Sequence, residues 1–284
     1  MKKIVLLIHC FALFVFSSCD KVEAPYNEAA IIPVDTTTSV KQRKILIEDF
    51  TGHTCPGCPR AAERIAQLQL LKPGRVIAIG EHVSEFFAAP EPGIYNIDFR
   101  TATGNANDSA FHMSDLGLPT GMVNRLFIAG SYRTEYASWA SIADTLLQKP
   151  AEAFITITNT YDTTSRTLNT SVKSEFLTSL NSTFKLAVYI TEDSIIAAQK
   201  DNLVPNPSDV LNYVHEHVLR TSVNGTFGET IASGAVANNF SVNKNYSKQI
   251  STLWKAKHCN VVAFIYDAVT KKVIQAEEKG ISAN

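Results

Sequence analysis

Two cysteines, Cys55 and Cys58, are separated by two residues in the stretch DFTGHTCPGCPR at positions 49–60. A thiol attacks a disulfide only as the thiolate, and the pKa of a free cysteine is near 8.5. A helix that begins near Pro56 would place Cys55 at its positively polarised N-terminus, which favours the thiolate. Cys58 would then lie one turn inside the helix. The spacing therefore predicts thiol–disulfide exchange, with Cys55 as the nucleophile and Cys58 as the resolving thiol.

A cysteine pair of this kind also occurs in zinc sites, but a structural zinc ion needs a second pair of ligands. The sequence has no second pair, and none of four further histidines has ligand spacing to the motif: His82, His112, His215 and His217. We therefore expect no metal and no other cofactor. His53, beside the motif, could support the thiolate, but we expect it to point into solvent.

The chain begins like an exported protein. Two lysines precede an apolar block at 4–16, which is shorter than the roughly 20 residues that a membrane-spanning helix needs. This pattern predicts a secretion signal over 1–18. The small residues before Cys19 resemble the cleavage site of bacterial lipoproteins, and the resemblance implies that Cys19 is acylated and anchors the protein to a membrane. Ordinary cleavage nearby, with Cys19 left as a free thiol, is the alternative.

The chain has five cysteines, and their positions isolate one pair. Cys10 leaves with the signal, and Cys19 is assigned to the lipid. Cys259 precedes an apolar run, so we expect a buried and inert thiol. Cys55 and Cys58 remain as the natural pair of an exported protein, in which disulfides are stable.

The spacing of apolar residues predicts the strands and helices that position the cysteine pair. Residues 19–43 are polar and show no persistent period, which predicts a lipidated N-terminus and tether. Residues 44–150 alternate strand and helix signals, which indicates an α/β domain. Apolar strand runs occur at 45–47, 76–79 and 122–128, and helical spacing occurs over 59–71 and 139–147. The irregular pattern of segment 84–116 indicates an insertion. It is either a lid over the site or a loop that the fold tolerates without a function.

After Pro150 the pattern changes to short strands. Apolar or alternating runs recur at 154–158, 168–172, 186–190, 213–218, 240–242, 261–266 and 273–276. About seven short strands separated by turn signals predict an antiparallel β-sandwich of immunoglobulin size over 151–284. Within this part, 194–200 could instead form a turn of helix.

Two stretches resemble the thioredoxin superfamily. The first is ILIEDF at 45–50 ahead of TCPGC, which looks like the strand that leads into the thioredoxin active site. Asp49 has the spacing of that fold's buried carboxylate, so the resemblance implies that Asp49 takes a proton from Cys58 during resolution. The alternative is that Glu48 and Asp49 flank a strand end in water, since adjacent residues of a strand face opposite sides.

The second stretch is Gly-Leu-Pro-Thr at 117–120. Thioredoxin-like proteins carry a cis proline opposite the cysteines in a similar context, so the resemblance implies a cis bond at Pro119. It also implies substrate binding by Leu118, Pro119 and Thr120, with the backbone of Leu118 pairing with an extended substrate chain beside Cys55. An ordinary trans proline at a strand entry is the alternative.

The arrangement as a whole is similar to the family of twenty-eight-kilodalton outer-membrane proteins. The most specific matches are TGHTCPGCP at 51–59 and GLPTG at 117–121. The resemblance implies an exported lipoprotein of the cell envelope, lipid-anchored in the outer membrane. It also implies an α/β thioredoxin-like domain followed by an all-β immunoglobulin-like sandwich domain.

Two functions fit these features, and the sequence does not decide whether the protein is an enzyme. The first is a thiol–disulfide oxidoreductase, whose partners are protein thiols and disulfides. The second is a surface binding or adhesion protein with a protein partner, in which Cys55 and Cys58 form a structural disulfide. The formal net charge of -1 and the lack of a long basic run argue against nucleic acid as a partner.

Overall fold

The computed structural model describes residues 41–281. The expected signal at 1–18, the lipidation site Cys19 and most of the tether lie outside the described residues. None of the helices between residues 41 and 281 is long and apolar enough to cross a lipid bilayer.

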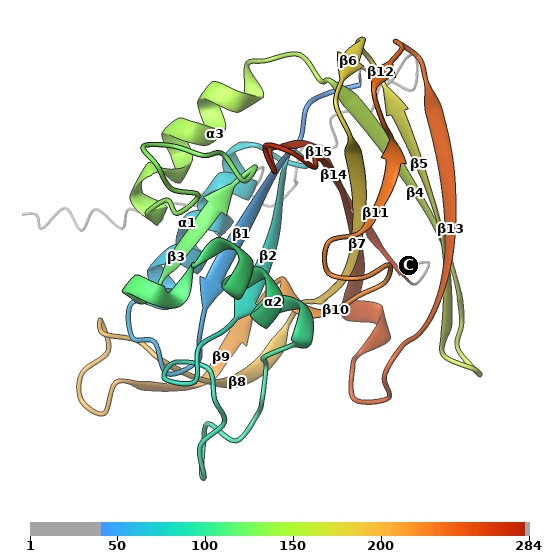
Figure 1. The fold of residues 1–284 in the computed structure, drawn as a ribbon. Helices are drawn as coiled ribbons and strands as arrows, with labels where there is room; N and C mark the ends of the chain where they lie inside the picture. The colour runs from blue at the N-terminus through green and yellow to red at the C-terminus, as the bar shows by residue number, and fades with distance from the viewer. Residues whose placement is uncertain (1–40, 282–284) are drawn as a thin grey trace, which may run out of the picture. The chain divides into compact units, whose positions relative to one another are not determined.

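One large mixed sheet dominates the fold (Figure 1). Its strands are β1 (Ile45–Thr51), β2 (Val76–His82), β3 (Thr120–Val123), β7 (Phe184–Glu192), β10 (Val218–Ser222), β11 (Glu229–Ala232), β14 (Cys259–Asp267) and β15 (Val273–Gly280). They lie in the order β15–β14–β7–β10–β2–β1–β3, and β11 also pairs with β7. The pairs β1–β2 and β2–β10 are parallel, and the other pairs are antiparallel.

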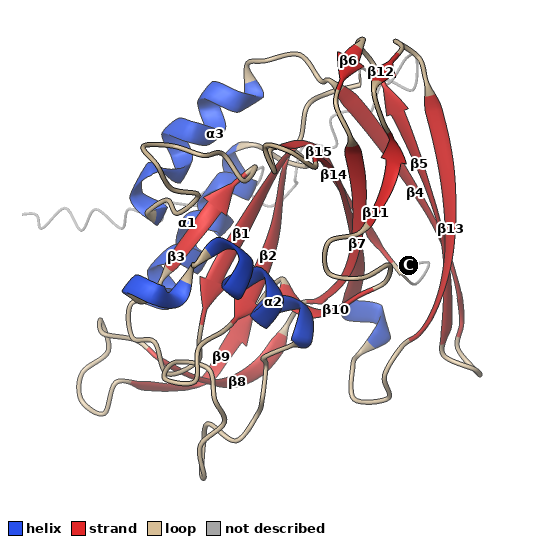
Figure 2. Ribbon diagram, viewed as in Figure 1, coloured by secondary structure: helices blue, strands red, loops and turns tan. Residues whose placement is uncertain are grey.

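Helices cover both faces of the β1–β2 region (Figure 2). The α-helices of the described residues are α1 (Cys58–Leu71), α2 (Ala102–Phe111) and α3 (Trp139–Leu147). Ile65 of α1 and Trp139 of α3 pack on the face that carries Ile47. Asn107 of α2 contacts Glu81 on the opposite face. Because both faces are covered, β1 and β2 are buried along nearly their whole length.

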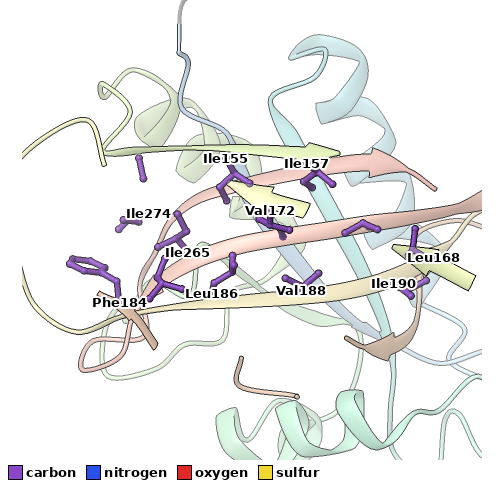
Figure 3. Packing of buried hydrophobic residues seen from close by; sticks show 14 of the residues in the cluster. Ile155, Ile157, Leu168, Val172, Phe184, Leu186, Val188, Ile190, Ile265 and Ile274 are labelled. Carbon is purple, nitrogen blue, oxygen red and sulfur yellow. The ribbon is translucent and has the colours of Figure 1, made fainter. Parts of the chain in front are cut away.

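A second layer is the antiparallel sheet β13–β5–β4, built from β4 (Ala153–Asp162), β5 (Thr167–Phe176) and β13 (Ser241–Gln249). Ile155 and Val172 of this layer pack against Leu186 and Ile265 of the large sheet (Figure 3). The side chains of β5 alternate between buried and less buried positions, as in a sheet with one covered face.

Two small strand pairs complete the structure. β8 (Ile195–Lys200) pairs with β9 (Asp209–His215), and β6 (Leu180–Asn181) pairs with β12 (Ala235–Val236). Short 3-10 helices lie at Ser114–Leu116, Tyr136–Ser138 and Ala256–His258. The alternative of a helical turn at 194–200 is wrong, because that segment contains strand β8.

The fold class expected from the sequence, an α/β thioredoxin-like domain followed by an all-β immunoglobulin-like sandwich, is wrong. Residues 41–281 contain strands β1 to β15 against three α-helices, and no separate thioredoxin-like domain stands out among them. β7, β10, β14 and β15 follow residue 150 and extend the sheet that β1, β2 and β3 begin. Ile77 and Ile79 of β2 are buried in one cluster with Tyr189 and Phe264. Local periodicity identifies each strand, but it does not indicate with which strand it pairs.

Candidate functional site

Cys55 and Cys58 form a disulfide at the start of α1, with their Cα atoms 5.5 Å apart. β1 ends at Thr51, and the turn that follows is closed where the Cys58 N–H donates to the Cys55 carbonyl (3.3 Å). The helix begins at Cys58, not near Pro56 as the sequence suggested, and Pro59 occupies its first turn, where no N–H partner is needed. Cys58 is therefore the sulfur at the helix N-terminus, and Cys55 lies in the preceding turn.

Asp49 borders a cavity of about 40 Å³ that Cys58 also borders. The side chain is buried, and its Oδ1 has no hydrogen-bond partner within residues 41–281. Burial raises the pKa of Asp49 to about 8, and the positive charge of His217 opposes that rise. A carboxyl group with such a pKa can accept and return a proton near neutral pH.

Glu48 precedes Asp49 on β1 and points to the other face of the sheet. It accepts two hydrogen bonds from the guanidinium of Arg125, at 2.8 and 2.5 Å, and both side chains are buried. The alternative that Glu48 and Asp49 flank a strand end in water is therefore wrong. Helices cover both faces of β1, so each acid points into the interior.

The sequence pattern does not single out Arg125. It predicts one strand over 122–128, whereas β3 ends at Val123 and the chain turns through left-handed φ angles of 48° at Asn124 and Arg125. The guanidinium of Arg125 lies over three aromatic rings, with its carbon 4.8, 4.9 and 5.3 Å from the centroids of Phe111, Phe264 and Tyr266. The signal for this ion pair is an arginine inside an apolar run. A cation in such a run is expected to be buried, and a buried cation requires an acidic partner.

Pro119 lies against the cysteine turn. The Leu118–Pro119 peptide bond is cis, so the expected cis bond is confirmed. A Cβ atom added at Gly57, between the cysteines, would lie 3.4 Å from Cδ of Pro119. Thr120 begins β3 and is buried, whereas Leu118 and Pro119 are partly exposed. The three predicted substrate-binding residues thus lie together beside the disulfide.

The disulfide is covered: Cys55 is 1% exposed and Cys58 is 2% exposed. Part of the cover is the segment after β2. The N–H of Thr54 donates to the carbonyl of Phe87 at 3.0 Å. Gly52 permits this close approach, since a Cβ atom there would lie 2.3 Å from the same carbonyl oxygen. The predicted insertion at 84–116 therefore packs, in part, directly on the cysteine turn.

The β8–β9 hairpin forms the other part of the cover. The side-chain amide of Gln199 donates to the carbonyls of Cys55 (3.0 Å) and Gly52 (3.2 Å). The N–H of Lys200 donates to the carbonyl of His53 at 2.9 Å. Two further contacts hold the loop of the hairpin against the cysteine turn and α1. The N–H of Asn202 donates to the carbonyl of Pro56 (2.9 Å), and Arg60 forms a salt bridge with Asp201 (2.5 Å). No sequence pattern indicates that this hairpin belongs to the site, because the hairpin lies far along the chain from the cysteines.

Three buried histidines surround Phe99 next to the disulfide. The ring centroids of His53, His82 and His215 lie 6.1, 4.8 and 5.0 Å from that of Phe99. Burial lowers the pKa of all three, to about 4 for His215. The expectation that His53 points into solvent is wrong, because its ring stacks on Tyr95 at 5.4 Å. Among residues 41–281, no cluster of histidine, cysteine or acidic side chains is arranged to hold a metal ion.

Cys259, the remaining cysteine of the described residues, is free and buried. Burial raises the pKa of its thiol to about 12, and the negative charge of Glu192 adds to the rise. A thiol with that pKa carries almost no thiolate at neutral pH. The expectation of a buried thiol is confirmed, and its pKa agrees with an inert group.

A family model described as "Outer membrane protein Omp28" matches residues 105–284. The chain belongs to this family. Membership confirms the family resemblance noted in the sequence, and it confirms the expected location of an exported outer-membrane protein. The residues matched by the Omp28 model include Pro119 and the β8–β9 hairpin but not Cys55 and Cys58. Membership of the Omp28 family therefore does not bear on the chemistry of the cysteines.

Two solved structures from Porphyromonas gingivalis are similar to this Omp28 family member. HBP35 is 16% identical with a TM-score of 0.64, and the match covers 86% of this chain and 77% of that chain. A domain of the outer membrane lipoprotein Omp28 is 20% identical with a TM-score of 0.33, and the match covers 46% of this chain and 89% of that chain. At this identity, the likeness to HBP35 shows a shared fold. No curated protein matches the chain.

Proposed function

We propose that this outer-membrane protein exchanges thiols and disulfides with partner proteins. Because α1 begins at Cys58, the helix N-terminus does not assign the roles of the two cysteines. Cys58 borders the cavity of Asp49, which can take its proton, so Cys58 is the resolving thiol and Cys55 is the nucleophile. The observation that carries the proposal is Asp49, a buried acid that borders the same cavity as Cys58. A structural disulfide needs no proton acceptor beside it, whereas a resolving thiol must lose its proton before it attacks. The pKa of Asp49, about 8, suits that transfer.

The cycle begins with the reduced protein. The Cys55 thiolate attacks a substrate disulfide, one substrate sulfur leaves as a thiolate, and a mixed disulfide forms at Cys55. Cys58 then gives its proton to Asp49 and attacks the sulfur of Cys55. The Cys55–Cys58 bond forms, and the second substrate sulfur leaves with the electron pair and takes a proton from water. The substrate disulfide is reduced, the cysteine pair is oxidised, and the reverse sequence oxidises a substrate dithiol.

Leu118, Pro119 and Thr120 form the wall on which a substrate chain would lie in this proposal. Leu118 and Pro119 are partly exposed, and Pro119 lies next to the cysteine turn. Cys55, however, is 1% exposed, so a protein disulfide reaches its sulfur only after the cover has moved. The β8–β9 hairpin and the segment around Phe87 must move away before the sulfur of Cys55 is accessible.

The test is turnover of a protein disulfide by the mature chain. We expect the wild-type protein to accelerate the reduction of insulin by dithiothreitol, and Cys55→Ser to abolish the acceleration. Cys58→Ser should instead trap a mixed disulfide at Cys55, seen by mass spectrometry. Cys259→Ser removes a thiol outside the site and is the matched control with unchanged turnover. Reduction no faster than with dithiothreitol alone would contradict the proposal.

A second function is favoured by the burial of both sulfur atoms. In that case the disulfide is structural, and the protein is a non-catalytic surface binding or adhesion protein. The reduction potential separates the two functions. Known exchange proteins lie between roughly −270 and −120 mV, whereas structural disulfides typically lie below about −300 mV. Unchanged partner binding after replacement of both cysteines by alanine would also favour the second function.

We also propose that Cys19 carries the lipid that holds the protein at the outer membrane. The short apolar block and the small residues before Cys19 support this, and the family of outer-membrane proteins fits it. We expect Cys19→Ser to release the protein from the membrane fraction, with Cys259→Ser as the control. Retention of the Cys19→Ser protein in that fraction would exclude Cys19 as the anchor.

A further inference from the structure

Asp49 lies between two adjoining cavities. The inner cavity, of about 40 Å³, is also bordered by Cys58, His82, Tyr213, His215 and Glu216. The outer cavity, of about 230 Å³, is also bordered by Glu63, Gln69, Tyr213, Glu216 and His217. A space of roughly 10–15 Å³ is enough for one water molecule, so both cavities have room for water. The exposed side chain of Glu216 lies on the border of both cavities.

The inner cavity is lined by buried polar atoms. Oδ1 of Asp49, both ring nitrogens of His82 and Nε2 of His215 have no hydrogen-bond partner within the part of the chain from 41 to 281. All three side chains are more than nine-tenths buried. Buried polar atoms of this kind are normally satisfied by protein groups or by ordered water. The lining therefore suits water that connects Cys58 with Asp49.

His217 borders the outer cavity and is held in place by two side chains. Its Nδ1 lies 3.2 Å from Oδ1 of Asp193, and its Nε2 lies 3.1 Å from Oε1 of Gln69. Burial lowers the pKa of His217, but the adjacent carboxylate of Asp193 outweighs burial, so the net shift is upward. The negative charge of Asp193 beside Nδ1 and the amide oxygen at Nε2 favour the protonated ring, in which both nitrogens carry a hydrogen.

The other titratable groups around Asp49 and His217 come from every neighbouring element. They are Cys58 and Glu63 of α1, His82 of β2, Asp193 after β7, Tyr213 and His215 of β9, Glu216 after β9 and Glu278 of β15. Burial lowers the pKa of His82, and burial together with the charge of Asp49 raises the pKa of Tyr213 to about 12. Of all these groups, His217 supplies the charge that opposes the effect of burial on Asp49.

We infer that His217 is a positioning residue of the exchange site: paired with Asp193 at the cavity that it shares with Asp49, it stabilises the carboxylate form of Asp49, and the outer cavity returns the proton of Asp49 to solvent. This inference rests on the proposed function of Cys55 and Cys58. Cys58 gives its proton to Asp49 as the Cys55–Cys58 bond forms, and Asp49 then releases the proton to water in the outer cavity. This step needs no further oxidant or reductant, because the Cys55 and Cys58 thiols supply the two electrons that the substrate disulfide receives.

The variant His217→Asn tests the electrostatic part. His217 has a φ angle of 58°, and asparagine tolerates this left-handed conformation. Loss of the positive charge leaves burial unopposed, so the carboxylate of Asp49 should form only at higher pH. The matched control is His112→Asn, because His112 has a similar φ angle of 56° but an exposed side chain. Nearby opposite charges shift a carboxyl pKa by roughly 1–3 units, so we expect an upward move of about one pH unit.

Two measurements separate this inference from the proposed function. The first is the titration midpoint of Asp49 in the oxidised protein, followed by NMR of carboxyl-labelled aspartate, which requires no exchange activity. We expect a higher midpoint in His217→Asn and in Asp193→Asn, and no change in His112→Asn. An unchanged midpoint in both of the first two variants would overturn the role of His217.

The second measurement is the rate at which Cys58 resolves a preformed mixed disulfide between Cys55 and glutathione, followed from pH 5 to 10. The inflection of this rate should move upward in His217→Asn together with the Asp49 midpoint. A profile that stays fixed while the midpoint moves would overturn the link to resolution. If the wild-type protein resolves no mixed disulfide at any pH, the proposed function itself fails, whatever the midpoint does.

Discussion

Asp49 couples the stability of the protein to pH. Its pKa is about 8 in the folded protein, against an ordinary value of 3.8. The unfolded chain therefore loses this proton at a lower pH than the folded chain does. Stability from the neutral acid is fully present below the unfolded pKa and is lost as the pH rises through about 8. The acid to which we assign proton transfer from Cys58 thus weakens the fold under alkaline conditions.

Asp49→Asn should remove this dependence. We expect the variant to be more stable than the wild type at pH 8, by roughly 2–5 kcal/mol, and to lose this advantage near pH 4. Denaturant unfolding at several pH values measures the difference. Asp144→Asn, on the exposed side of α3, is the control for charge removal. A stability difference that does not vary with pH would contradict the buried-acid interpretation.

Arg125 and Glu48 make a second residue-level prediction. Arg125→Met leaves Glu48 buried without its partner, and loss of one member of a buried ion pair costs about 3–5 kcal/mol. We expect this loss in the free energy of unfolding, measured in denaturant. The double variant Glu48→Met/Arg125→Met should recover part of it, since no unpaired charge remains. Equal losses in the single and double variants would mean that packing, rather than charge, dominates at this position.

At the scale of elements, the β8–β9 hairpin covers the cysteine turn. Its contacts with the cysteine turn are hydrogen bonds and one ion pair, and it adds few buried apolar side chains. Elements of this kind open at lower free energy than the core does. The hairpin is therefore the part of the cover that we expect to move first.

Gln199→Ala should loosen this cover. It removes the hydrogen bonds from the side-chain amide of Gln199 to the carbonyls of Cys55 and Gly52. We expect Cys55 of the reduced variant to be alkylated by iodoacetamide several-fold faster than in the wild type, because about 1 kcal/mol per hydrogen bond corresponds to about five-fold in opening. Mass spectrometry of the labelled peptide gives the rate, and the denatured protein gives the upper limit. Equal rates in the two folded proteins would show that the hairpin does not limit access.

The elements near the cysteines could be predicted from the sequence because their signals are local. The runs at 45–47 and 76–79 lie within β1 and β2, and the helical spacing over 59–71 corresponds to α1 at Cys58–Leu71. The expected strand at 213–218 instead ends at His215, and β10 begins at Val218, because His217 takes a left-handed φ. Nothing in these local patterns indicates that β10 pairs with β2.

The residues of the candidate site likewise fall into two groups: those that the sequence predicts and those that only long-range strand pairing brings to the site. Cys55, Cys58, Asp49 and Pro119 were found from spacing and from resemblance, since they lie in two short stretches. Groups from the second half of the chain, such as His217, were not found, because only the long-range pairing of β2 with β10 brings them to Asp49. Single-residue spacing carries no information about such contacts.

At the scale of the whole molecule, the large sheet joins the two halves of the chain. Ile79 of β2 is buried in one cluster with Tyr189 of β7 and Phe264 of β14. A fragment of residues 41–150 would expose this cluster and leave the β2 edge unpaired. We expect the fragment not to fold alone, and the chain from residue 41 to 284 to unfold in one cooperative transition.

Circular dichroism and thermal unfolding of both polypeptides test this expectation. The fragment should lack a sigmoidal transition, whereas the longer chain should show one that coincides when helix content and tryptophan fluorescence are followed. A fragment that melts cooperatively would show that residues 44–150 form an independent domain after all.

The strand order also has a consequence during synthesis. The cysteines enter the nascent chain long before the hairpin that covers them, because β8 and β9 lie more than a hundred positions later. Domains with such distant pairings fold slowly, and their early segments stay exposed in the meantime. We therefore expect the Cys55–Cys58 bond to form after export, while the hairpin has not yet covered the two sulfur atoms and oxidants of the cell envelope can reach them. The newly folded protein would then carry the Cys55–Cys58 disulfide, and its first exchange reaction would be with a reductant.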